Sequence, residues 1–361
     1  MRRRRRDVLL GASALLAGSG LHAPAIAQGI RELKLVTDWP GAMPGFQTSA
    51  ERLARSIGEI SGGRLNIRVF GAGALVRPFE TFDAVGAGVA DMYHSADHYF
   101  GGKSPGFYVF SAAPYGLTAD EMTSWIAFGG GQALWDELGA GFNIKPLLAL
   151  NTGVQMGGWF AKEIHGPEDF KGLRYRMPGL GAEVLRRMGA TVVTTPADQI
   201  ITALKSGAID ASEWVGPWLD MWLGLDQAAD HYYYPGFHEP ASSVTLGINK
   251  ALWDGLGAAD QAIISAATAA ELTRSLAEFN SENVKALKLL RANPRIKLHR
   301  FDDALIKAFG RVGQEVMSDM AAHDSLSRRI YDSYRAFLAG IMDWGELSET
   351  GYRDTRRLAL G

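Results

Sequence analysis

The sequence contains no cysteine among its 361 residues. This absence excludes a disulfide-stabilised scaffold, a thiolate nucleophile, and zinc or iron–sulfur sites built on cysteine ligands. The chain also lacks an excess of either charge, since 37 Lys and Arg stand against 39 Asp and Glu. A nucleic-acid-binding surface is therefore not expected. Hydrophobic residues make up 47% of the chain and charged residues 21%, which is typical of a globular protein and not of a disordered one.

Familiar catalytic motifs are missing as well. The sequence has neither a G-x-S-x-G nucleophile elbow nor an H-E-x-x-H zinc motif. The segment His94–His98 holds two histidines four residues apart with an aspartate between them, which would suit zinc on a helix. Because this segment follows a predicted strand into a loop, polar residues lining a cleft are the better explanation. Gly179–Gly181 resembles a dinucleotide-binding turn, but Val184 replaces its third glycine.

The first 27 residues have the pattern of an export signal. A basic run, Arg2–Arg6, is followed by the apolar stretch Val8–Leu21 and by the small-residue cleavage site Ala25–Ala27. The apolar stretch is too short, and too rich in Gly and Ser, for a membrane-spanning helix. The pair Arg5-Arg6 before apolar residues is typical of twin-arginine (Tat) export, with a Sec signal carrying surplus arginines as the alternative. Removing five arginines and one aspartate moves the formal net charge from −2 to −6.

Strand and helix patterns alternate through most of the chain, which predicts an α/β fold with a parallel layer. A Gly- and Pro-rich loop is predicted at residues 101–106. The predicted strands are 33–38, 65–70, 90–94, 144–151, 155–161, 173–177, 191–194, 208–211, 242–248 and 295–298. The predicted helices are 46–60, 79–89, 119–138, 182–188, 197–204, 250–290 and 302–341.

The character of the sequence changes near Asn151 and changes back near Ser242. These changes predict two lobes joined by crossing strands. The C-terminal helix is expected to be much longer than the average of about 11–12 residues, and so to brace both lobes or to pack against another subunit. The expected divisions are residues 28–150 with 242–290 for the first lobe, 151–241 with 291–301 for the second, 302–341 for the long helix and 342–361 for a tail.

Polar residues at predicted strand ends are the candidate binding residues. Arg176 ends a strand, where open α/β sheets form their ligand crevice, and its planar guanidinium suits a carboxylate. A surface ion pair is the alternative for Arg176. Gln155 follows a buried strand, and the pair Glu213-Trp214 closes another strand in the same region. A carboxylate that shares a pocket with an anionic ligand needs a cation between them.

Two ordered motifs resemble a known family. The segment Gly166–Pro178, followed by Gly189–Pro196 and Ala203–Glu213, resembles the DctP-type solute receptors of TRAP transporters. The resemblance covers essentially the whole mature chain. It implies a two-lobed periplasmic binding protein of type II-like architecture, with hinge strands and a long C-terminal helix. Such a receptor closes over a small organic acid and delivers it to the membrane subunits of the transporter.

Within that family, Glu213-Trp214 together with Gln155 resembles the branch that binds 2-oxo acids or related monocarboxylates through a metal ion. The resemblance implies that Arg176 holds the carboxylate of the acid. Sodium or calcium suits the implied oxygen donors. The implied ligands of the ion are Gln155, the Glu213 carboxylate, the Trp214 backbone carbonyl and, as a further one, Glu239. For the side chain of Trp214, the alternative is a core aromatic residue that does not touch the ligand.

The remaining expectations concern the acid and the partner subunit. Tyr99 and Asn151 are expected to donate hydrogen bonds to the acid, with ordinary loop contacts as the alternative. The long C-terminal helix resembles one that members of this branch exchange between subunits, which implies a homodimer. The competing function is an exported enzyme that acts on an organic acid in the same cleft. The identity of the acid, whether pyruvate, a longer 2-oxo acid or a 2-hydroxy acid, is left open by the sequence.

Overall fold

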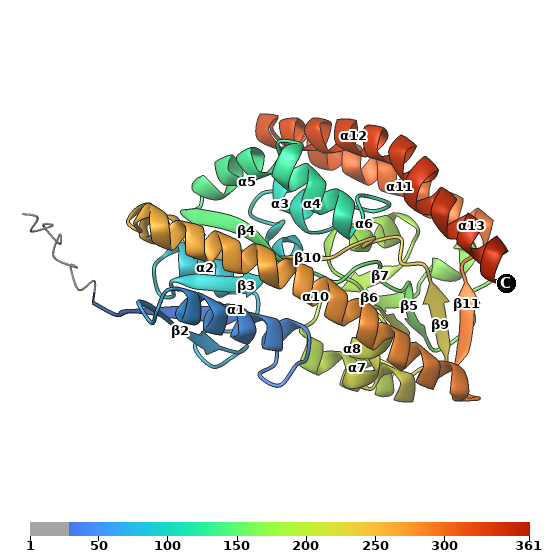
Figure 1. Cartoon of the computed structure of the whole chain (residues 1–361). Helices are drawn as coiled ribbons and strands as arrows, with labels where there is room; N and C mark the ends of the chain where they lie inside the picture. The colour runs from blue at the N-terminus through green and yellow to red at the C-terminus, as the bar shows by residue number, and fades with distance from the viewer. Residues whose placement is uncertain (1–28) are drawn as a thin grey trace, which may run out of the picture.

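Two β-sheets, each flanked by helices, organise the chain (Figure 1). The computed structural model describes residues 29–361, so the predicted export signal at residues 1–27 lies outside the described residues. The chain passes from the first sheet to the second after residue 151, returns before residue 243, and enters the second sheet again after residue 292. The α/β class predicted from the alternating patterns is confirmed.

The first sheet has the strand order β2-β1-β3-β10-β4. Strand β1 pairs in parallel with β2 and β3, whereas β10 runs antiparallel to β3 and β4. The second half of β4 is buried throughout, which explains its near-continuous apolar sequence. The strands are β1 (Arg31–Thr37), β2 (Leu65–Phe70), β3 (Met92–Ser95), β4 (Ile144–Asn151) and β10 (Ser243–Asn249).

The second sheet has the order β11-β9-β5-β8-β6-β7. Strand β6 pairs in parallel with β8, in a register that places Arg176 opposite Ser212. Both strands end at this pair, so the residue that follows Ser212, Glu213, emerges beside Arg176. The strands are β5 (Gly158–Phe160), β6 (Arg174–Arg176), β7 (Thr191–Val193), β8 (Ala211–Ser212), β9 (His231–Tyr234) and β11 (Lys297–Arg300).

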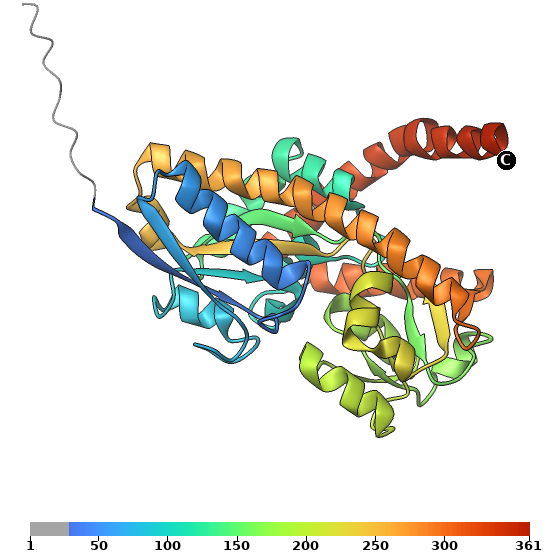
Figure 2. The same cartoon turned by 60° about the horizontal axis from the view of Figure 1, so that its bottom comes forward.

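Helix α10 (Ala258–Ala292) spans the two sheets. It packs against α1 (Phe46–Ile60) and β4 on one side and against α8 (Pro217–Leu223) on the other, as Figures 1 and 2 show. The ring of Phe279 in α10 lies 5.5 Å from that of Phe46 and 5.3 Å from that of Trp218, so one side chain contacts helices from both halves. In the part of the chain described, no helix combines the length and apolar character needed to span a bilayer.

Shorter helices cover the remaining faces. The helix predicted at 119–138 is interrupted at Gly130, whose backbone φ of 86° suits glycine, and forms α4 and α5. The predicted loop at 101–106 ends in a short helix, α3, at Gly106. These helices are α2 (Thr81–Gly86), α3 (Gly106–Ser111), α4 (Ala119–Phe128), α5 (Gly131–Ala140), α6 (Gly179–Arg187), α7 (Ala197–Lys205) and α9 (Lys250–Asp254).

The predicted C-terminal helix at 302–341 is two helices and not one. Helix α11 (Asp303–Ala321) ends before a turn, and α12 (Ser325–Gly345) begins after it. Asp324 sets the start of α12, because its side chain accepts a hydrogen bond of 2.8 Å from the backbone N–H of Ser327.

Helical structure continues through the predicted tail at 342–361. A single π-helical turn (Glu346–Thr350) joins α12 to α13 (Gly351–Leu360). A long C-terminal helix is therefore present, but its bounds are Ser325 and Leu360. Its last part extends away from the rest of the molecule (Figure 2).

Candidate functional site

The ends of strands from both sheets enclose a small buried cavity. It holds about 20 Å³, room for roughly one water molecule. Six of the predicted binding residues line this cavity, namely Tyr99, Gln155, Arg176, Glu213, Trp214 and Glu239. Its remaining lining residues are Trp39, Phe46, Ala96, His98, Pro178, Val215 and Ser242.

Arg176 and Glu213 form a buried ion pair at the centre of the site. Each residue is 1% exposed, so the surface ion pair considered for Arg176 is excluded. The Nη1 atom of Arg176 donates to Oε1 and, at 3.3 Å, to the backbone carbonyl of Glu213. Its Nε and Nη2 atoms both donate to the carbonyl of Thr195 at 3.2 Å. The guanidinium carbon lies 5.2 Å from the ring centroid of Trp214, an arrangement that favours a cation.

Glu239 contributes a second buried carboxyl group. Its Oε2 atom accepts a hydrogen bond of 2.9 Å from Nε2 of Gln155, and Oε1 lies 3.4 Å from Nδ1 of His98. Burial raises the pKa of Glu239 to about 7, and the neighbouring charge of Glu213 adds to the rise. The cavity thus holds one cationic side chain against two carboxyl groups, one of which is poised to be neutral.

The arrangement of oxygen atoms suits a hard cation. The amide nitrogen of Gln155 is used by Glu239 and by the hydroxyl of Thr152 at 3.3 Å, which leaves its Oε1 atom buried and without a partner. Together with the Glu213 carboxylate, this amide oxygen belongs to the donor class that sodium and calcium prefer. The described residues contain no group of three or more His, Asp or Glu side chains that could hold a metal ion. Any cation here would depend on amide and backbone oxygens as well as on carboxylate.

The two histidines of the segment His94–His98 do not converge. His94 accepts a hydrogen bond of 2.9 Å on Nδ1 from the indole nitrogen of Trp39, while Nδ1 of His98 lies 3.0 Å from the Ser111 hydroxyl. Burial lowers the pKa of each imidazole to about 3. The zinc interpretation therefore has no geometry to support it, and the cleft-lining interpretation holds for His98, which lines the cavity.

The neutral state of His94 makes a testable contribution to pH stability. The unfolded chain binds a proton on this residue below pH 6.5, whereas the folded protein does so only near pH 3, so its contribution to stability is lost as the pH falls through that window. The substitution His94→Gln keeps an acceptor for Trp39. Between pH 7 and pH 5, the free energy of unfolding of the variant is expected to fall by about 2 kcal/mol less than that of the wild type. Urea unfolding at both pH values measures this difference. An equal fall in the free energy of unfolding of the two proteins would contradict the prediction.

Asn151 is not brought to the cavity. Its Nδ2 atom donates to the Ser243 hydroxyl at 3.2 Å, and its Oδ1 atom accepts from the backbone N–H of Gly153 at 2.9 Å. Both halves of the amide therefore hold the end of β4 against β10. Tyr99 does line the cavity, with its ring 4.4 Å from that of Phe79.

Sequence reasoning missed the apolar wall of the cavity and the support behind it. The rings of Trp39 and Phe46 stack with their centroids 4.3 Å apart. The only feature of the sequence that could have indicated them is that they are aromatic residues near the end of a strand. Asp220 anchors the segment after Trp214, since its carboxylate accepts from the backbone N–H of Val215 at 3.0 Å. The same carboxylate accepts from the Trp159 indole at 2.9 Å and from the Tyr232 hydroxyl at 2.7 Å.

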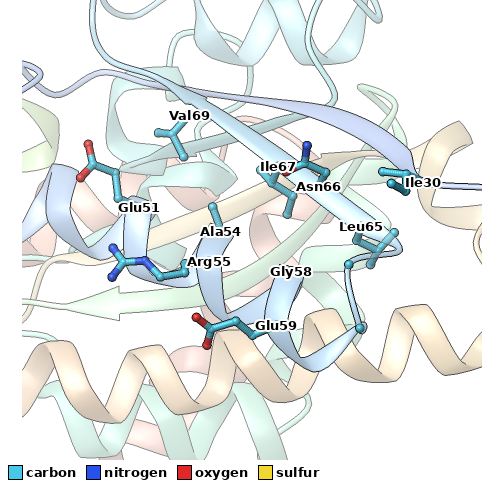
Figure 3. Close-up of a pocket in the computed structure, with 12 residues that line it drawn as sticks. Ile30, Glu51, Ala54, Arg55, Gly58, Glu59, Leu65, Asn66, Ile67 and Val69 are labelled. Atoms are coloured by element: carbon cyan, nitrogen blue, oxygen red, sulfur yellow. The ribbon is translucent and has the colours of Figure 1, made fainter.

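A larger groove lies elsewhere, along α1 and the edge strand β2. It has a volume of about 770 Å³. Figure 3 shows Glu51, Arg55 and Glu59 projecting from α1, with Ile67 and Val69 on β2. None of the predicted binding residues lines this groove. Volume alone would favour this groove, whereas the convergence of buried charged side chains favours the small cavity, which we take as the candidate site.

Comparison with known proteins shows the family of the chain. The family model of DctP, described as bacterial extracellular solute-binding protein, family 7, matches residues 39–324. A curated relative from Nostoc sp. is a monocarboxylate 2-oxoacid-binding periplasmic protein. It is 34% identical over 359 residues, which cover 97% of this chain and 98% of the relative.

Two solved structures are similar over nearly their whole length. One is a TRAP periplasmic solute-binding protein from Pseudoalteromonas atlantica with bound sodium and pyruvate. It has a TM-score of 0.87 at 33% identity, and the match covers 90% of this chain and 99% of that one. The other, from Bordetella bronchiseptica, is a mixed-occupancy dimer with calcium and picolinate in its active site. It has a TM-score of 0.89 at 31% identity, and the match covers 92% of this chain and 98% of that one.

Proposed function

Because this chain belongs to the DctP family of bacterial extracellular solute-binding proteins, we propose that it captures a small monocarboxylate with an oxygen on C2 in the periplasm. A 2-oxo acid such as pyruvate is the first candidate, taken up together with sodium or calcium and passed to TRAP membrane subunits. The observation that carries the proposal is the buried Arg176–Glu213 pair beside the unpartnered amide oxygen of Gln155. The protein belongs to a family of receptors and not of enzymes.

The charges of the site explain why acid and cation bind together. The buried pair is neutral, and a carboxylate entering beside it adds an uncompensated negative charge. A bound cation supplies the compensating positive charge. Arg176 then donates to the carboxylate of the acid through its planar fork, while the Glu213 carboxylate, Gln155 Oε1 and the Trp214 carbonyl face the cation. Glu239 is a further oxygen ligand of the cation, and Tyr99 donates a hydrogen bond to the acid.

Capture also requires the cavity to open, since its present volume does not admit an acid. We keep the predicted division into lobes, with residues 28–150 and 242–290 in one and 151–241 and 291–301 in the other. The segments that connect the two sheets, 152–157 and 235–242, then act as hinges. Contacts of the acid with residues from both lobes favour the closed state over the open one.

A thermal-shift screen tests this function. We expect pyruvate with sodium or calcium to stabilise the mature protein by about 2.7 kcal/mol at a concentration one hundred times its Kd. The acid alone, after removal of both cations, should give a much smaller shift, and the acid should be recovered unchanged after incubation. Turnover of the acid, or no shift with any 2-oxo or 2-hydroxy acid, would contradict the proposal.

The C-terminal helix supports a homodimer as part of the same function. None of the residues in the π-helical turn or in α13 is buried. Large apolar side chains in these two elements and at the end of α12 are well exposed, with Trp344 of α12 at 64%, Leu347 at 76%, Tyr352 at 63% and Leu358 at 83%. An exposed apolar strip of this kind marks an interaction site. We propose that a second copy of the chain covers it.

A chain truncated after Gly345 tests the dimer contact independently of acid binding. The mature protein is expected to sediment as a dimer, and the chain ending at Gly345 as a monomer that keeps its affinity for the acid, because no cavity-lining residue is removed. Sedimentation equilibrium measures both masses. A truncated chain that is still dimeric would show that another surface makes the contact, and the charge substitution Leu358→Glu in the full chain provides the matched control.

A further inference from the structure

The indole N–H of Trp214 is a buried donor without a partner. The residue is 7% exposed, and no acceptor in the described part of the chain lies within hydrogen-bond reach of its Nε1 atom. A buried donor left unsatisfied costs about 1–3 kcal/mol. The ring is held in place, since it lies edge-on to Phe46 at 6.2 Å and 5.2 Å from the guanidinium carbon of Arg176. Trp214 lines the cavity, and its ring holds this free donor in a fixed position.

Apart from the hydroxyl of Tyr99, which can donate as well as accept, the other free polar atoms of the cavity wall are acceptors. The free atom of Gln155 is its amide oxygen. In His98, Nδ1 faces the Ser111 hydroxyl at 3.0 Å, and this hydroxyl itself donates to the Ser243 carbonyl at 3.2 Å. Nδ1 must then carry the hydrogen of the neutral ring, which leaves the unpartnered Nε2 as an acceptor. The second indole of the cavity, that of Trp39, already donates to His94 at 2.9 Å.

The oxygens of the acid show where this donor is needed. In the proposed function, on which this inference rests, the carboxylate meets Arg176 and the cation. The oxygen on C2 meets the cation through one lone pair, and its second lone pair needs a donor once it is buried. We infer that the indole N–H of Trp214 donates a hydrogen bond to the C2 oxygen of the bound acid. This bond makes Trp214 a residue that selects acids with an oxygen on C2 over unsubstituted acids.

The substitution Trp214→Phe removes the N–H and keeps an aromatic ring over Arg176. Calorimetric titration with pyruvate, and competition of propionate against pyruvate, should be carried out with saturating sodium or calcium. We expect the variant to lose about three- to tenfold in affinity for pyruvate. Its affinity for propionate, which lacks the C2 oxygen, should change by less than about twofold. The pyruvate-to-propionate preference therefore falls, while a loss of packing alone would weaken both acids equally.

Trp39→Phe is the matched control. It removes an indole N–H from the same cavity, but one that is bonded to His94, and it should change the affinity for both acids by the same factor. An unchanged preference in Trp214→Phe overturns the inference, and so does a loss of preference in Tyr99→Phe instead, which would assign the C2 oxygen to the tyrosine hydroxyl. If the wild type binds neither acid, the proposed function fails; if it binds pyruvate and only the preference is unmoved, the inference alone fails.

Discussion

Replacing Arg176 by alanine is expected to reduce the affinity for the acid by at least about 100-fold, because removing one partner of a buried charge pair costs about 3–5 kcal/mol. Arg176 is 1% exposed and lies within the cavity, so water cannot replace its guanidinium as a partner for the carboxylate. The conservative change Arg176→Lys keeps the charge and loses the planar fork, and it should give an intermediate loss. Isothermal titration calorimetry with pyruvate and a saturating cation measures all three proteins.

Two controls separate binding from folding. Arg176→Ala leaves the carboxylate of Glu213 buried and unpaired, so the double variant Arg176→Ala/Glu213→Gln should recover thermal stability without recovering binding. Arg174, two residues earlier on the same strand, is paired with Asp210 on the surface, and Arg174→Ala should leave the affinity unchanged. Equal affinity in Arg176→Ala and wild type would show that the acid binds elsewhere.

Glu213→Gln is expected to uncouple acid binding from the cation. In the wild type the Glu213 carboxylate neutralises Arg176, so the acid needs a further positive charge. In the variant, Arg176 faces a neutral amide and pairs with the acid directly. The cation should raise the wild-type affinity by about 100-fold, near the upper end of usual coupling free energies of about 1–3 kcal/mol. In the variant the increase should be less than about threefold. Titrations with and without sodium or calcium measure the coupling in each protein.

Glu239→Gln is the matched comparison for this result. Glu239 lines the same cavity, but its oxygens face Gln155 and His98 and do not pair directly with Arg176. Its pKa is already raised to about 7 by burial, so the neutral amide resembles its protonated form. This variant should keep most of the cation dependence. A cation dependence that survives in Glu213→Gln but disappears in Glu239→Gln would transfer the role of principal carboxylate ligand to Glu239.

Strong periodic patterns predicted the fold well. The helix at 46–60 and the strands at 65–70 and 144–151 have the bounds of α1, β2 and β4, because each has a clear apolar pattern ended by polar or glycine residues. The elements that were missed are short, such as α3, α8 and β9. Strand β9 has four residues, three of them tyrosine, and its pairing with β5 and β11 decides its structure more than its own sequence does.

The C-terminal error has a local cause. The apolar spacing of 302–341 continues across residues 322–324, and only the capping side chain of Asp324 marks the break. Such a cap is visible in a sequence, but it competes with the stronger signal of helical periodicity.

The candidate site was predicted in its charged part and not in its apolar part. Arg176 ends β6, and Glu213 directly follows the last residue of the paired strand β8, so the sheet register places them side by side. Asn151 failed to reach the cavity because its amide is used between β4 and β10. His238, with Nε2 3.3 Å from Oε2 of Glu213, follows an irregular loop, and no pattern in the sequence indicates where such a loop returns.

The measurement that tests the central claim most directly is the reciprocal coupling between acid and cation. Calorimetry of the mature protein gives the factor by which a saturating cation raises the affinity for pyruvate, and the factor by which saturating pyruvate raises the affinity for the cation. Binding of both in one site between Arg176 and Glu213 predicts two large and equal factors. An affinity for pyruvate that does not depend on sodium or calcium would contradict the account.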